Sequence, residues 1–171
     1  AYADGDFTVQ IHGHYRRTAT DGYQGHPAHV GESYTNRSTE VAATVTVRAP
    51  DGQGYRETSV TFSAPASLAG ITVTRTPTND GQEAVTVTCD GITVTHPEAF
   101  DRLLWMADAV LPLGDVTSVS PVTDGGYTLC LRTADGRETR TFACRDDIPY
   151  PTSVTYVHPD MEAELHLTFI P

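Results

Sequence analysis

The sequence predicts a mainly β domain that is interrupted by a single amphipathic helix. Thr and Val alternate in several segments, and such β-branched residues suit a pleated surface that is buried on one side. The 14 Gly and 11 Pro divide the chain into short segments, as is typical of many short strands. In one segment the spacing of apolar residues changes to a helical period. A length of 171 residues fits one domain.

The strands are expected to form a series of antiparallel hairpins. Their predicted ranges are 7–14, 40–48, 55–63, 71–74, 84–88, 92–95, 116–122, 127–132, 137–145, 153–158 and 162–169. The turn at Asp135 and Gly136 predicts a register in which Leu129 faces Phe142 and Tyr127 faces Cys144. This register places Cys144 on the inner face and Cys130 on the outer face, so a disulfide between them is disfavoured. A contact between Cys89 and Cys144 is compatible with this register, and the sequence does not decide whether it forms.

The first 40 residues differ from the rest in composition. After the strand at 7–14, residues 16–37 are polar and rich in Gly, His, Thr and Tyr, which indicates a long irregular connection. Residues 1–40 are therefore expected to be part of the same domain or partly disordered, and residues 41–171 to form the main body.

One helix is predicted between Pro97 and Gly114. Proline is well tolerated in the first turn, and Glu98 suits the positive end of the helix dipole. The apolar residues follow i, i+3, i+4 spacing. They are Phe100, Leu103, Leu104, Ala107, Val110 and Leu111, with Trp105 and Met106 beside them.

From about residue 41 onward, several segments resemble one known superfamily. They are Pro65–Gly70 before a strand, Cys89–Val94 before the helix, Phe100–Leu113, Asp147–Val154 and Glu164–Phe169. With these segments the chain resembles the LolA/LppX-like envelope lipoprotein carriers and related Gram-positive lipoproteins. The resemblance implies an antiparallel sheet curved into an incomplete β-barrel, with the helix on its concave face.

The resemblance also implies a hydrophobic cavity for acyl chains and an exported, lipid-anchored domain in the cell envelope. The predicted ligand-binding residues are Phe100, Leu103, Leu104, Trp105, Leu111, Leu129 and Phe142. The helix side chains fill the space as plain core or cover a pocket, and the sequence leaves both open. No cofactor is expected. We expect an export signal or lipid-modified Cys to have been removed upstream of residue 1.

The charge of the chain excludes one class of partner. The formal net charge is -11, and the 11 basic residues are all Arg. An acidic surface without a basic stripe is repelled by phosphate backbones, so nucleic acid is excluded as a partner. No apolar run approaches the about 20 residues that a membrane helix needs, so any membrane contact is expected through the removed anchor.

Two alternative functions come from the N-terminal part. His12, His14, His26 and His29 predict a metal-binding β domain, because imidazoles are common ligands of transition metals. Gly13 and the polar loop indicate mobility there. The tyrosines at 15, 23 and 34 predict instead a protein or glycan recognition module without a cavity.

Catalysis is not expected. The chain has no Gly-x-Ser-x-Gly nucleophile motif and no phosphate-binding glycine loop. His96 and His158 each precede a proline, which fits strand-ending turns. The sequence therefore predicts a non-enzymatic, extracytoplasmic binding domain whose partner is a hydrophobic ligand or an envelope protein.

Overall fold

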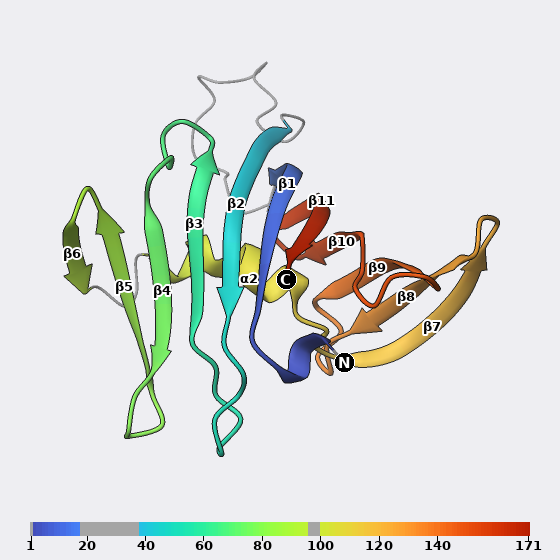
Figure 1. The fold of residues 1–171 in the computed structure, drawn as a ribbon, viewed down its shortest axis with the longest axis horizontal. Coiled ribbons are helices and arrows are strands. Elements are labelled where there is room, and N and C mark those ends of the chain that lie inside the picture. The colour runs from blue at the N-terminus through green and yellow to red at the C-terminus, as the bar shows by residue number, and fades with distance from the viewer. Residues whose placement is uncertain (1, 18–37, 96–99) are drawn as a thin grey trace, which may run out of the picture.

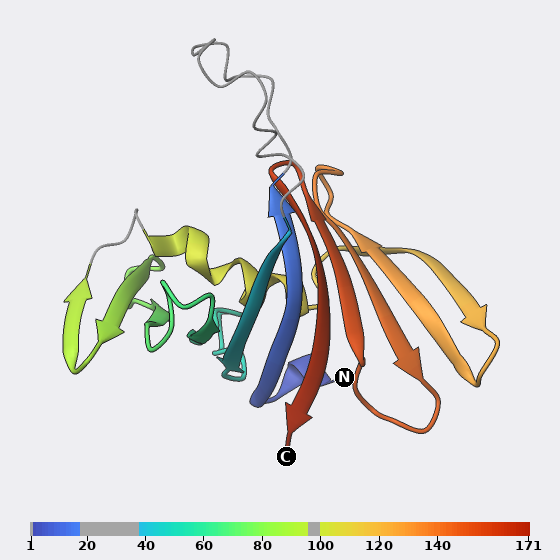
Figure 2. The same ribbon diagram turned by 90° about the horizontal axis from the view of Figure 1, so that it is seen from above.

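The computed structural model describes residues 2–17, 38–95 and 100–171, which form one open antiparallel sheet with helical segments across one face (Figures 1 and 2). The strands are β1 (Phe7–Arg17), β2 (Thr39–Val47), β3 (Thr58–Ala64), β4 (Thr72–Pro77), β5 (Glu83–Cys89), β6 (Ile92–Thr95), β7 (Asp115–Val122), β8 (Gly126–Arg132), β9 (Thr139–Arg145), β10 (Ser153–His158) and β11 (Met161–Ile170). The helical segments are η1 (Tyr2–Asp4), η4 (Asp101–Leu104) and α2 (Trp105–Val110).

The eleven strands follow the order β6-β5-β4-β3-β2-β1-β11-β10-β9-β8-β7. The chain runs outward from β1 to β6, crosses the sheet through η4 and α2, and returns from β7 to β11. The first and last strands pair in the middle of the sheet, from Thr8 opposite Ile170 to Arg17 opposite Met161. The sheet is not closed, because among the described strands β6 and β7 have no partner on their outer sides.

The helical segments lie on the buried face of the sheet, between its two halves. Helix α2 contacts β2 and β3 of the first half and β10 of the second, while η4 contacts β3 and β4. Valines of the inner face, such as Val9, Val45 and Val60, are fully buried with Met106 and Val110 of the helix. The sheet therefore curves around the helix, as expected for an incomplete barrel.

Hydroxyl side chains cover the outer face of the first half of the sheet. Residues 44–46, 72–74, 86–88 and 93–95 all read Thr-Val-Thr. Because side chains alternate along a strand, each valine points opposite to its threonines. Facing hydroxyls from neighbouring strands lie 2.9 Å apart at Thr61 and Thr72, and 3.0 Å apart at Thr88 and Thr93.

The predicted strands and the predicted register are confirmed. Leu129 pairs with Phe142 and Tyr127 with Cys144, as the turn at residues 135–136 indicated. Cys89, Cys130 and Cys144 are all free. Strand β1 continues three residues beyond His14, the expected end, to Arg17.

The helix is shorter than predicted. The sequence indicated one helix from Pro97 to Gly114, but a 3-10 segment ends at Leu104 and α2 ends at Val110. Leu111 is extended, with φ −79 and ψ 135. The ring of Pro112 disfavours a helical conformation at the residue before it, which explains this end. The expected first turn begins at Pro97, and residues 96–99 lie outside the described residues.

Gly13, for which the sequence indicated mobility, lies inside strand β1. Gly13 is buried in β1, paired with Val41 on one side and Leu165 on the other. A Cβ atom there would lie 2.0 Å from the backbone oxygen of Glu164. Glycine is required here because the neighbouring strand passes too close for any side chain.

Candidate functional site: a pocket between the helix and the sheet

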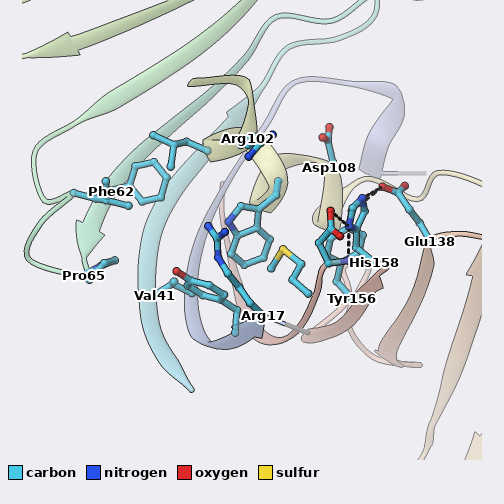
Figure 3. Close-up of a pocket in the computed structure, with 15 residues that line it drawn as sticks. Arg17, Val41, Phe62, Pro65, Arg102, Asp108, Glu138, Tyr156 and His158 are labelled. Atoms are coloured by element: carbon cyan, nitrogen blue, oxygen red, sulfur yellow. Dashed lines mark hydrogen bonds and ion pairs between the residues drawn. The ribbon is translucent and has the colours of Figure 1, made fainter. Parts of the chain in front are cut away.

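A pocket of about 410 Å³ lies between the helical segments and the ends of the central strands (Figure 3). Volumes of this order are usual for small-molecule sites. The lining residues are Tyr15, Arg17, Val41, Phe62, Pro65, Leu68, Arg102, Leu103, Trp105, Asp108, Glu138, Tyr156, His158, Asp160 and Met161. The first and last strands both contribute side chains to the pocket lining, because β1 and β11 are neighbours in the sheet.

Trp105 is the central aromatic residue of this pocket, and it is the only tryptophan of the chain. Its ring lies 5.6 Å from that of Tyr15 and 6.4 Å from that of Tyr156, and the latter pair is nearly parallel. Val41, Phe62 and other apolar residues complete this part of the lining. Such a surface favours an apolar ligand, because binding removes its carbon atoms from water.

One side of the pocket is polar and is formed by Glu138, Tyr156 and His158, which we call the polar wall. The Tyr156 hydroxyl donates to Glu138 Oε1 at 2.8 Å, and His158 Nε2 lies 3.8 Å from the same oxygen (Figure 3). Burial, followed by the hydrogen bond to Glu138, raises the pKa of Tyr156. The Asp160 backbone N–H donates to His158 Nδ1 at 3.1 Å, which holds the imidazole in place.

Arg140 lies behind the polar wall and connects it to the helix. Its guanidinium is fully buried and donates to Glu138 Oε2 at 3.1 Å and to the Asp108 carbonyl at 2.9 Å. The guanidinium carbon also lies 5.1 Å from the centre of the Tyr156 ring. Since Asp108 belongs to α2 and Arg140 to β9, the Arg140 side chain fixes the helix against that strand.

Tyr2 secures the end of the same helix from the other side. Its hydroxyl donates to the Val110 carbonyl at 2.6 Å, and burial raises its pKa. The ring of Tyr2 packs on Phe7 and Phe169, with centroids 5.4 and 5.2 Å away. Two carbonyls near the end of α2, those of Asp108 and Val110, thus accept hydrogen bonds from side chains in distant parts of the sequence.

The predicted ligand-binding residues divide into two groups. Leu103 and Trp105 line the pocket. Leu104, Leu111 and Phe142 are buried in the core, while Phe100 and Leu129 pack against it. The helix therefore fills the core with one part of its surface and covers a pocket with another.

The predicted metal ligands are only partly described. His12 is exposed on the outer face and stacks on His166, with ring centroids 5.1 Å apart, and His14 is exposed on the same face. His26 and His29 lie outside the described residues, as do Tyr23 and Tyr34 of the recognition hypothesis. Within residues 2–17, 38–95 and 100–171, no three His, Cys, Asp or Glu side chains form a group that could hold a metal.

Sequence reasoning missed Arg140 and the polar wall. A signal was present, because Arg140 shares its strand parity with Phe142 and so had to point inward. The positions of Glu138 and His158 gave no such signal, since their meeting depends on the pairing of β9 with β10.

Comparison with known proteins finds likeness only at the level of structure. No protein-family model and no curated protein matches the chain. Similar solved structures include a DUF1329 family protein from Desulfovibrio piger, with a TM-score of 0.47 and 8% identity over 96% of this chain and 84% of that one.

Two further structures are similar in the same way. An uncharacterized conserved protein from Thermus thermophilus has a TM-score of 0.44 and 14% identity, with 98% of this chain and 82% of that one covered. A proposed outer membrane lipoprotein-sorting protein domain from Vibrio parahaemolyticus has a TM-score of 0.42 and 9% identity, with 96% and 85% covered. Likeness at this level does not transfer a function, which has to be argued from the pocket.

In the part of the chain that is described, no helix has the length and apolar character needed to cross a membrane.

Proposed function

We propose that this chain is a non-enzymatic binding domain that holds a hydrophobic small molecule, such as a lipid, in the pocket between its helix and its sheet. The observation that carries this proposal is the pocket of about 410 Å³ around Trp105. We also propose an extracytoplasmic location, in the envelope or outside the cell, where such a domain would meet lipids.

The anchoring of the helix supports a pocket that is formed before the ligand arrives. Arg140 and Tyr2 hold the last turn of α2 from two sides, at 2.9 and 2.6 Å. A preformed pocket loses little conformational entropy on binding. The apolar part of the lining then supplies the affinity, at about 0.8 kcal/mol for each methylene that leaves water.

The polar wall supports binding in preference to catalysis. Glu138 already accepts hydrogen bonds from Tyr156 and Arg140, and His158 Nδ1 accepts one from the Asp160 backbone. The hydrogen bonds of Glu138 and His158 are therefore made within the protein, and they hold these side chains in fixed orientations. In the proposed binding domain, these side chains fix the shape of the pocket.

The test uses Trp105 as the reporter, since it is the only tryptophan and lines the pocket. Neutral straight-chain alcohols of increasing length, kept below their aggregation limits, are titrated while Trp105 emission is followed. We expect saturable binding that tightens about fourfold for each added methylene until the pocket is full.

Two variants make the test specific. Leu103→Arg places a charge in the pocket lining and should abolish the saturable signal, whereas Leu113→Arg changes an exposed residue that follows the helix and should leave it unchanged. The proposal is wrong if the folded wild-type protein shows no saturable, length-dependent change in emission.

A further inference from the structure

The charges around the pocket are arranged unevenly, although the chain as a whole is strongly acidic. Arg17 comes from the end of β1 and Arg102 from η4, and both line the pocket. Figure 3 shows both arginines apart from the Glu138–His158 side. Both side chains belong to exposed residues, so they border the opening of the pocket.

Two carboxylates of the lining are neutralised from within the protein. Asp108 Oδ1 lies 2.8 Å from Arg75 Nη2, and Glu138 Oε2 lies 3.1 Å from Arg140 Nη2. Each has an arginine partner of its own, so neither leaves an uncompensated charge facing the pocket. The third carboxylate, Asp160, is 68% exposed and lies 3.9 Å from His158 Nδ1.

Unlike Asp108 and Glu138, Arg17 and Arg102 have no side-chain partner within the part of the chain that the structure describes. Across the described residues, neither guanidinium makes a hydrogen bond or an ion pair. With respect to the described residues, both guanidinium groups are open to a bound molecule. A guanidinium presents a planar set of N–H donors that matches the oxygen pairs of a carboxylate or a phosphate.

From this arrangement, and resting on the proposed function, we infer that the ligand is an anionic amphiphile: its aliphatic chain lies against Trp105 and its negatively charged head group lies between Arg17 and Arg102. A carboxylate and a phosphate monoester share the required chemistry. Because the whole chain carries a net charge of -11, its long-range field attracts cations, so a preference for anions would have to come from these two arginines.

The experiment compares dodecyl chains that differ only in their head groups, with Trp105 emission as the readout. The probes are dodecanoate, dodecyl phosphate, neutral dodecanol and cationic dodecyltrimethylammonium, each below its aggregation limit. We expect both anions, or one of them, to bind more tightly than the alcohol, and the cation to bind most weakly. The tighter anion identifies the source of the head group.

Variants then assign the effect to the two arginines. Arg17→Gln and Arg102→Gln should each weaken binding of the preferred anion by about two- to fivefold, as for exposed ion pairs, and leave dodecanol unchanged. Arg137→Gln, at an exposed arginine outside the pocket lining, is the matched control and should change nothing. All three residues are exposed, so their replacement is not expected to disturb folding.

The outcomes separate this inference from the proposal on which it rests. If dodecanol binds as tightly as both anions, or the glutamine variants bind the anions like wild type, the anionic head group is excluded while a hydrophobic pocket stands. If no probe binds to the folded protein, the proposed function itself is excluded.

Discussion

At the scale of single residues, Arg140 is the side chain on which the position of the helix depends. It is fully buried, and its donors reach Glu138, the Asp108 carbonyl and, at 3.5 Å, the Leu113 carbonyl. A buried arginine is tolerated only when such partners replace the water it loses. Here the partners come from the segments on both sides of the helix end, so one side chain joins the sheet to the helix.

Replacing Arg140 with Met is expected to lower the free energy of unfolding by about 2–4 kcal/mol. The change leaves Glu138 without its arginine and two carbonyls without a donor, and a buried group that loses its partner is costly. Urea denaturation followed by far-UV circular dichroism measures this loss.

Arg145→Met is the control on the same strand. Arg145 pairs with Asp147 at 2.9 Å, but both side chains are more than half exposed, so its loss should cost less than about 1 kcal/mol. Equal effects of the two substitutions would show that Arg140 does not anchor the helix.

At the scale of elements, the pairing of β1 with β11 depends on a close approach of two backbones at Gly13. The ideal Cβ position there is 2.0 Å from the Glu164 oxygen and 3.0 Å from the Leu165 Cα. Backbone atoms cannot move aside as a flexible side chain does. The strand therefore holds glycine at this position in order to keep its register with β11.

Gly13→Ala is expected to destabilise the fold by about 1–3 kcal/mol, because the added methyl group separates the two strands. Gly5→Ala is the matched control, since no atom lies within 4 Å of its Cβ position. Its effect should stay within about 0.5 kcal/mol. Thermal melting of both variants checks this, and similar melting temperatures would contradict the close approach.

At the scale of the whole molecule, the two halves of the sheet share one core. Strands β1 and β11 pair in the centre, and α2 contacts β2, β3 and β10. Neither half can bury its inner face alone, because the helix covers residues of both. The protein should therefore fold as one cooperative unit.

Equilibrium unfolding in urea is expected to show a single transition. Trp105 emission reports the contact between the helix and the sheet, and far-UV circular dichroism reports the strands, so their normalised curves should coincide. The Gly13→Ala variant should shift both curves together. A transition at a different urea concentration for each probe would show that the halves unfold separately.

The sequence by itself determined the local features of this protein. Alternation of Thr and Val placed the strands, the turn at residues 135–136 set the pairing of Leu129 with Phe142, and the apolar spacing located the helix. These features depend on residues close together along the chain, so period and turn chemistry are sufficient to predict them.

The tertiary structure alone decided which of these elements build the pocket. Tyr15 and Met161 line it together because the first and last strands pair in the centre of the sheet, and Arg17 and Arg102 line the same pocket because the helical segments cross that face. Such contacts join residues far apart in sequence, and local periodicity carries no information about them. They form because one open sheet has to bury the inner faces of both its halves against the same short helix.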